Sequence, residues 1–273
     1  MAAEVAGPPE RVLNVRPSPG REEDHTPAAA EAAGHLRPVE PPERLDLRAP
    51  WYVVGDQGRT GSCVGWALAD SVLWRQLVRA GRLDEEDRLS PRFMWMAAKE
   101  MRAKLTAVRG EPAWHPTTFL EQGMTDVKSA LDVARTFGAA LEQDLPWKGA
   151  LYPGVIEHFY ESSARRRISH YYRLDPEEEA TAWFGHWRRW LHQHGPVLLV
   201  LGVDRQFTDG APALEAFDYD SSSFHHAVAL VGYGPGGFLI RCSWGESWGQ
   251  DGYAVAGEAY LAQASIESYG VVI

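Results

Sequence analysis

The stretch "DQGRTGSCVGWA", residues 56–67, decides how the chain is interpreted, because it holds one of only two cysteines in 273 residues. Glycines crowd the approach to this cysteine, at positions 55, 58 and 61. Apolar residues at helical spacing follow it as far as Ala80, and Gly81 is a natural helix end. The pattern therefore predicts that Cys63 lies on a turn at the N-terminus of a helix.

A cysteine in this position can serve as a nucleophile. The thiolate is the attacking species, and both a helix N-terminus and a neighbouring imidazolium lower a thiol pKa. The glycines leave backbone N–H groups free to face an oxyanion, and the side-chain amide of Gln57 can donate to the same oxygen. The alternative is that Cys63 is a small buried apolar residue, as free cysteines often are.

Composition restricts the possible functions. The net charge of −10 disfavours nucleic acid and anionic membranes as partners, and 45% hydrophobic residues suffice for a sizeable core. We see no apolar run near the 18–20 residues that a membrane span needs, and no secretory signal in "MAAEVAGPPERV". Two cysteines form no disulfide framework, so we expect a cytoplasmic protein.

The chain divides into three parts. Residues 1–45 are rich in Pro, Ala and Glu and are expected to form a disordered tail, the alternative being a short pro-segment or docking arm. Helical patterns then follow, at 63–80, after Ser90, around 125–138 and near 176–194. Short glycine-punctuated strands occupy the rest, which predicts an α+β fold with a helical lobe at about 56–155, a β lobe at about 156–273 and a cleft between them.

Three separated segments resemble the papain-like cysteine peptidases. "DQGRTGSCVGWA" resembles the nucleophile segment, "HAVALVGYG" at 226–234 the histidine strand, and "LIRCSWGESWGQDGY" at 239–253 the strand and loop that follow. "LSPRF" and "TDVKSALDVARTFGAALEQDLPW" also resemble parts of the helical lobe. The resemblance implies a two-lobe papain-like domain over residues 46–273, with a β-barrel-like second lobe.

The resemblance also implies the site. Cys63 would be the nucleophile, His226 its proton-transfer partner, and Gln57 with the Cys63 N–H the oxyanion hole. Cys242 stands where the family has an asparagine that orients the histidine, and a thiol is a weak acceptor and donor. Reduced activity is therefore expected. Trp244 would cover the histidine, and Gly123 would let a substrate backbone approach.

The resemblance implies a peptide or protein substrate and requires no metal or organic cofactor. His225 adjoins His226 and, because neighbouring strand residues face opposite sides, is expected at the cleft rim. Two other functions stay open: a weak or inactive papain-fold protein that binds peptides, and a thiol acyltransferase that passes the acyl group to an amine. A disulfide between Cys63 and Cys242 is disfavoured, because the imidazole would lie between them.

Overall fold

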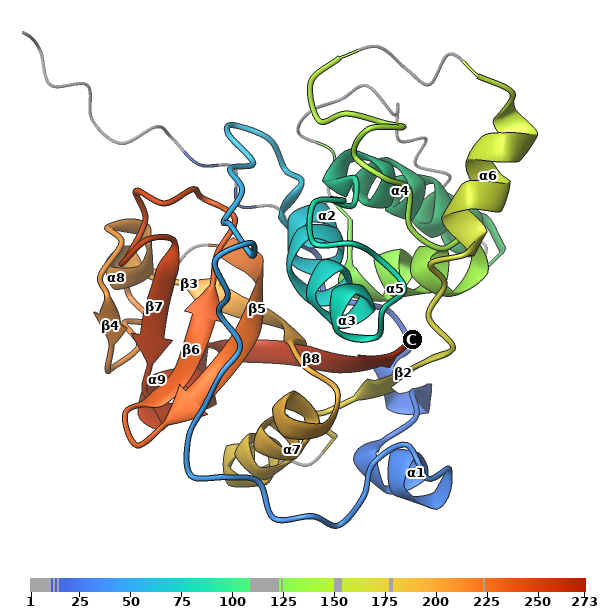
Figure 1. The fold of residues 1–273 in the computed structure, drawn as a ribbon. Helices are drawn as coiled ribbons and strands as arrows, with labels where there is room; N and C mark the ends of the chain where they lie inside the picture. The colour runs from blue at the N-terminus through green and yellow to red at the C-terminus, as the bar shows by residue number, and fades with distance from the viewer. Residues whose placement is uncertain are drawn as a thin grey trace, which may run out of the picture.

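The computed structural model describes residues 11, 13, 15–108, 123, 125–149, 154–176, 179–222 and 224–273, without the side chains of 103–108. Helices gather on one side of the molecule and a twisted sheet on the other, with the long strand β8 (Ser265–Val272) running beneath both (Figure 1). This arrangement confirms the predicted α+β fold. Among the described residues, no helix is long and apolar enough to cross a membrane.

The helix after Cys63 forms as predicted, but in three successive parts. It comprises α2 (Cys63–Gly65), a π-helical section η2 (Trp66–Leu73) and α3 (Trp74–Arg79). Nearly every side chain of α2 and η2 is buried, so this is the central helix of its lobe. Gly81 ends it with a left-handed φ of 65°.

Two further helices begin at the predicted residues. The helix α4 (Pro91–Val108) starts after Ser90, whose hydroxyl accepts the backbone N–H of Phe93 at 3.0 Å. The helix α5 (Val127–Thr136) is capped by Asp126, which accepts the N–H of Ser129 at 2.8 Å. Part of the region between them, residues 109–122, lies outside the described residues.

The β lobe is an open sheet. Its order is β2-β8-β3-β5-β6-β7-β4, with β1 (Leu45–Asp46) pairing along β5 beyond the end of β3. The remaining strands are β2 (His170–Arg173), β3 (Val197–Val203), β4 (Ala213–Leu214), β5 (Phe224–Gly234), β6 (Gly237–Arg241) and β7 (Tyr253–Ala256). Because this path does not close on itself, the expected barrel-like form is not confirmed.

Helices cover and flank the sheet. The predicted helix near 176–194 is α7 (Ala180–Gln193), which lies along the lower face of the sheet in Figure 1. The short helices α8 (Arg205–Thr208) and α9 (Glu258–Ala264) were not predicted. The helix α6 (Ile156–Ala164) packs on the helical lobe, where the rings of Phe93 and Phe159 lie 5.6 Å apart. The helical lobe therefore extends past residue 155.

The expected disordered tail is wrong for residues 15–45. A 3-10 turn η1 (Arg21–Glu23) and the helix α1 (Pro27–Ala32) occupy this segment, and Ala30 and Leu36 are buried. The segment has no core of its own, but it adds single side chains to the core of the domain. Residues 1–10 lie outside the described residues.

Buried charges fix this segment to the sheet. Arg21 pairs with Asp175 and lies 3.4 Å from a carboxylate oxygen of Glu267 on β8. The backbone N–H of Ser18 donates to the other oxygen of Glu267 at 3.3 Å. Burial raises the pKa of Glu267 from 4.5 to about 7, although Arg21 and Ser18 oppose the shift.

This raised pKa predicts a pH dependence of stability. Because the folded pKa of Glu267 exceeds its unfolded value, its contribution is fully present below about pH 4.5 and is lost as pH rises through about 7. We expect the unfolding free energy of the wild type to fall by on the order of 2 kcal/mol more than that of Glu267→Gln between pH 5 and 8. Urea unfolding at several pH values measures this.

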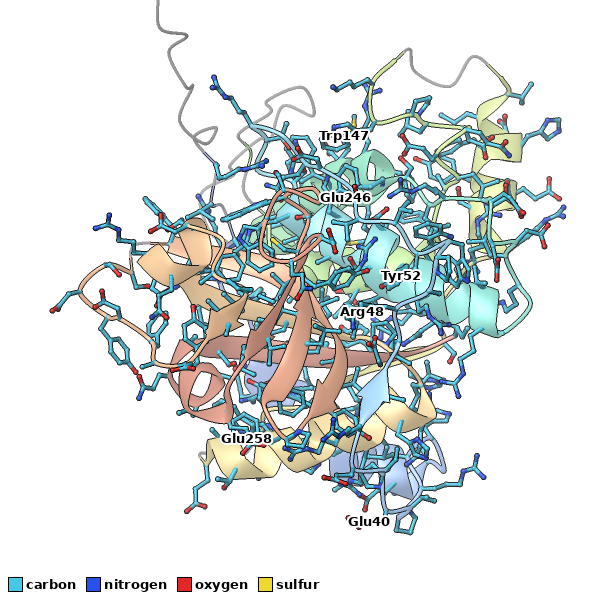
Figure 2. The ribbon with its side chains drawn as sticks, turned by 60° about the vertical axis from the view of Figure 1, so that its left-hand side comes forward. Glu40, Arg48, Tyr52, Trp147, Glu246 and Glu258 are labelled. Carbon is cyan, nitrogen blue, oxygen red and sulfur yellow. The ribbon has the colours of Figure 1, made fainter. Side chains whose placement is uncertain are left out.

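Glu258→Gln is the control, because Glu258 forms a partly exposed pair with Arg188 and lies at the edge of the molecule in Figure 2. This variant should keep the wild-type pH profile. Parallel profiles for the wild type and Glu267→Gln would contradict the assignment of the titration to Glu267.

Candidate active site

Backbone hydrogen bonds join the segment before Cys63 to the loop after β6. Gly245 donates its N–H to the carbonyl of Gly55 at 3.0 Å, and Gln57 donates to the carbonyl of Ser243 at 2.9 Å. Between these bonds, Asp56 and Trp244 form an isolated antiparallel bridge. The glutamine and the cysteine of the first motif are thereby held against the loop of the third motif, more than 180 residues away in the sequence.

Cys63 lies where the sequence predicts, as the first residue of α2, and is fully buried. Ser62 precedes it with a non-helical backbone, and its hydroxyl lies 2.6 Å from that of Thr60. Two of the nearby glycines have clear steric reasons. A Cβ on Gly55 would lie 2.0 Å from the ring of Trp66, and Gly58 has a φ of 62°.

Gln57 is also fully buried, and its amide is oriented on both sides. Its Oε1 accepts the hydroxyl of Ser243 at 2.7 Å, and its Nε2 donates to the carbonyl of Thr60 at 2.7 Å. A hydroxyl donor on one side and a carbonyl acceptor on the other fix which amide atom is nitrogen. The N–H face of Gln57 is therefore directed toward the turn that leads to Cys63.

His226 lies on β5, opposite Leu201 of β3, and is fully buried. Its Nε2 lies 3.5 Å from the sulfur of Cys242, while its Nδ1 has no hydrogen-bond partner. The thiol of Cys63 lies near enough to Cys242 to raise the pKa of that residue electrostatically. The structure thus gathers Cys63, His226 and Cys242 in one place, with the second nitrogen of the ring unpartnered.

Aromatic rings enclose the histidine. Trp244 is almost fully buried, and its ring centroid lies 4.8 Å from that of His226. Phe207 of α8 packs edge-on to both rings, at 5.8 Å from His226 and 5.3 Å from Trp244. Trp244 therefore packs against the imidazole ring.

Arg11 lies over this centre. Its guanidinium donates to the carboxylate of Asp56 at 2.8 Å and to the carbonyl of Trp244 at 3.0 Å, and lies 5.6 Å from the Trp244 ring centroid. It therefore links both lobes across the cleft. Further along the same segment, the N–H of Arg16 donates to the carbonyl of Thr125 at 3.1 Å.

This closed arrangement disfavours an ion pair between a Cys63 thiolate and a His226 imidazolium. Burial, and secondarily the charge of Arg11, lower the pKa of His226 from 6.5 to about 3. Burial also raises the pKa of the Cys242 thiol. The imidazole is therefore neutral near pH 7, whereas the imidazolium expected from the sequence needs a more solvated site.

The two remaining candidates occupy different places. Gly123 is buried, and its carbonyl accepts the indole N–H of Trp95 at 3.1 Å. His225 is partly buried on β5 beside His226. Burial lowers its pKa, although a hydrogen bond to the backbone of Val15 acts in the opposite direction. His225 thus contacts the N-terminal segment rather than the thiols.

Sequence reasoning missed several contributors to this site, namely Arg11, Asp56, Thr60, Phe207 and Ser243. Ser243 and Asp56 adjoin motif residues, so their position was a usable signal. Arg11 and Phe207 gave no such signal, because each reaches the site only through the folded path of a distant segment.

Comparison with known proteins agrees with this geometry. The model of the papain family cysteine protease matches residues 123–272. Cathepsin J of Mus musculus is 26% identical over 225 residues, covering 78% of this chain and 59% of the relative. Papain of Carica papaya is 48% identical over 46 residues, which are 17% of this chain and 12% of papain. The chain thus spans less than two thirds of these curated relatives.

Solved structures show the same fold. Xylellain, a cysteine protease from Xylella fastidiosa, superposes with a TM-score of 0.72 at 19% identity, covering 98% of both chains. Digestive procathepsin L 3 of Tenebrio molitor gives 0.60 at 19% identity, covering 87% of this chain and 72% of the other. A papain fold with a cysteine and a histidine at the lobe junction defines the class. The chain belongs to the papain family of cysteine proteases.

The contacts of Arg11 lead to a prediction about thiol access. Arg11→Ala removes both links across the cleft, and charged hydrogen bonds are each worth roughly 1.5–3 kcal/mol. We expect iodoacetamide to label Cys63 at least about tenfold faster in this variant, with Cys242 still slow. Mass spectrometry of the labelled peptides measures both rates.

Arg48→Ala is the matched control, because it removes another arginine–aspartate pair, with Asp46, at an exposed position. Its labelling rates should equal those of the wild type. If Arg11→Ala also labels at the wild-type rate, Arg11 does not close the site.

Proposed function

We propose that this protein is a cysteine peptidase that hydrolyses peptide bonds in the cleft between its lobes. The observation that carries the proposal is the pairing of His226 Nε2 with Cys242, which leaves Nδ1 unpartnered beside the residues that surround Cys63. The family assignment supports the same chemistry. The substrate is a peptide or a protein, and the reaction needs no cofactor.

The proposed reaction uses four groups. The Cys63 thiolate attacks the scissile carbonyl carbon, and the oxyanion is held by the Cys63 N–H and by the Gln57 amide. That amide nitrogen carries two hydrogens, one of which is bonded to Thr60, so one is left for the oxyanion. His226 gives its proton to the leaving amine, and then takes a proton from the water that cleaves the thioester.

Cys242 is a positioning residue in this proposal. It accepts the Nε2–H of His226 and so keeps the lone pair of Nδ1 available to the thiol. A contact of 3.5 Å with a weak acceptor holds the ring less firmly than an amide oxygen would. Activity should therefore be lower than the same site would give with asparagine.

We further propose that the form with Arg11 in place is inactive. The neutral, buried state of His226 supports this view, since an activated thiolate needs a nearby imidazolium. The N-terminal segment would act as a short pro-segment, held in place by Arg11, Arg16 and Arg21. Displacing its first residues would admit both water and substrate.

We also propose that the protein works in the cytoplasm. Both of its cysteines are free thiols, which fits a reducing compartment. Labelling of both thiols in protein taken directly from cells, before any reductant is added, would test this. Recovery of a mixed disulfide at Cys63 would oppose the proposal.

One other function has a specific observation in its favour. A buried thiol at the orienting position and a neutral histidine would also suit a papain-fold protein that captures peptides without cutting them. The same variants that test the peptidase separate the two functions.

The decisive experiment profiles hydrolysis of a mixed peptide library. In the Arg11→Ala background, we expect Cys63→Ala to abolish cleavage and Cys242→Asn to raise kcat about tenfold, because an amide oxygen makes a stronger hydrogen bond to the ring. Cys242→Ala should lower kcat and leave the fold intact. If neither the Arg11→Ala protein nor the same protein with Cys242→Asn cleaves any peptide of the library, the peptide-binding function is favoured.

A further inference from the structure

A pocket adjoins the proposed oxyanion hole on the side of the helical lobe. It encloses about 470 Å³, and Gln57 itself forms part of its wall. Its other side chains include three cations, Arg59, Arg92 and Lys148, and two indoles, Trp95 and Trp147. We call this set the cationic pocket. Nothing in the proposed reaction uses these five residues.

The three cations lack acidic partners. Among the described residues, none of them forms an ion pair with a carboxylate. Arg92 instead donates to the carbonyls of Pro146 and Gly149, both at 3.1 Å, which holds its guanidinium at the pocket wall. Three cations around one cavity with no paired carboxylate among the described residues favour binding of an anion.

Two carboxylates lie near the pocket and do not neutralise it. Asp56 lines the rim, but its carboxylate is already bonded to Arg11 and to the N–H of Gly58. Glu142 accepts the backbone N–H of Trp147 at 2.5 Å, and Arg92 acts on it only through space. Neither carboxylate is paired with Arg59 or Lys148.

The indoles give the pocket a firm shape. The ring of Trp147 packs edge-on to that of Trp66 at 5.1 Å and lies 6.1 Å from that of Trp95. The N–H of Trp95 is held by the carbonyl of Gly123. A ligand that enters the pocket therefore meets a fixed aromatic wall, and the cations need little reorganisation to reach it.

The position of the pocket assigns it to one half of the substrate. The leaving amine takes its proton from His226, whose ring packs on Trp244, and Trp244 pairs with Asp56 at the pocket rim. The N-terminal segment contacts Thr125 through Arg16, which follows Arg11 by five residues. In Figure 2, Trp147 lies at the same end of the molecule as Glu246, which follows Trp244 by two residues. The pocket thus adjoins the leaving-group half.

We propose that the cationic pocket binds a carboxylate of the substrate on the C-terminal side of the scissile bond. This inference rests on the proposed peptidase function. The carboxylate is either the C-terminal group of a short peptide or the side chain of an acidic residue. Both have the charge that Arg59, Arg92 and Lys148 require, and an adjacent apolar group would pack on Trp147.

The test compares cleavage of matched peptide pairs by the Arg11→Ala protein, in which the closing contact is absent. Each cleaved peptide is made with a C-terminal acid or amide, and with Asp or Asn at each leaving-group position. We expect kcat/KM to be about tenfold higher for the acidic member, mainly through KM, because up to three partly exposed charge pairs form. A preference for the free acid alone identifies the C-terminal group, and a preference for Asp alone identifies a side chain. Either result supports the proposal.

Variants attribute the preference to the pocket. Arg59→Gln with Lys148→Gln should reduce the ratio to near one without changing kcat/KM for the amide peptides. Arg59→Lys with Lys148→Arg should keep it, because charge is conserved. Arg165→Gln with Arg167→Gln makes the same change in net charge at residues that do not line the pocket, and should leave the ratio unchanged.

Failure of this inference differs from failure of the peptidase proposal. Equal cleavage of acid and amide, and of Asp and Asn, by an enzyme that Cys63→Ala inactivates would overturn the pocket and leave the peptidase intact. If no peptide is cleaved, calorimetric binding of the same pairs to the full-length protein with both Cys63→Ala and Arg11→Ala decides the matter. The proposal is supported if the acidic peptide binds tenfold more tightly than its neutral partner and if this difference disappears when Arg59→Gln and Lys148→Gln are added. Equal binding of the two peptides overturns it.

Discussion

The hydrogen bonds between residues 55–57 and 243–245 are the constraint on which the site depends. They are backbone bonds between two loops, one carrying Gln57 and the other following Cys242. Since Gln57 is bonded to Ser243 through both its backbone and its side chain, the amide and the loop after Cys242 move as one unit. A buried ion pair between Arg241 of β6 and Asp70 of η2, at 2.9 Å, also joins the two lobes. Removing one partner of such a buried pair costs about 3–5 kcal/mol, so this ion pair helps to fix the position of one lobe relative to the other.

Closure by Arg11 changes the electrostatics of that unit. A catalytic thiolate and imidazolium stabilise each other, but both lose hydration when a segment covers them. Arg11 adds a positive charge at the point where an imidazolium would form, so it opposes the charged histidine while its own charge is satisfied by Asp56. In the proposed mechanism, the same contact closes the cleft and suppresses the ionised pair. Displacing the segment would then reverse both effects together, so that a single structural change would suffice for activation.

The sequence was informative where function depends on local pattern. Ser90 with Pro91, and Asp126 before α5, are capping signals that act within one turn, and both helices begin there. The strand β8 has no such local signal, because "SIESYGVV" does not alternate and is buried along most of its length between β2 and β3. The N-terminal segment was misjudged for a related reason: Ala30 and Leu36 are too sparse to form a core, yet each fits a site provided by the domain. Such long-range complementarity leaves no periodic trace in one sequence.

The thiol at position 242 is tolerable because the ring of His226 has other restraints. Trp244 and Phe207 contact the imidazole from two directions, and the residue is fully buried on a strand paired through its own backbone. Packing of this kind fixes the plane of a ring, whereas a hydrogen bond fixes which nitrogen carries the proton. In the proposed reaction the sulfur of Cys242, 3.5 Å from Nε2, accepts the N–H of that atom, because a proton on Nδ1 would face the nucleophile and leave no lone pair there to take the thiol proton. In this chain the geometry of the histidine therefore rests mainly on aromatic contacts, and the choice of tautomer rests on a weak bond to Cys242.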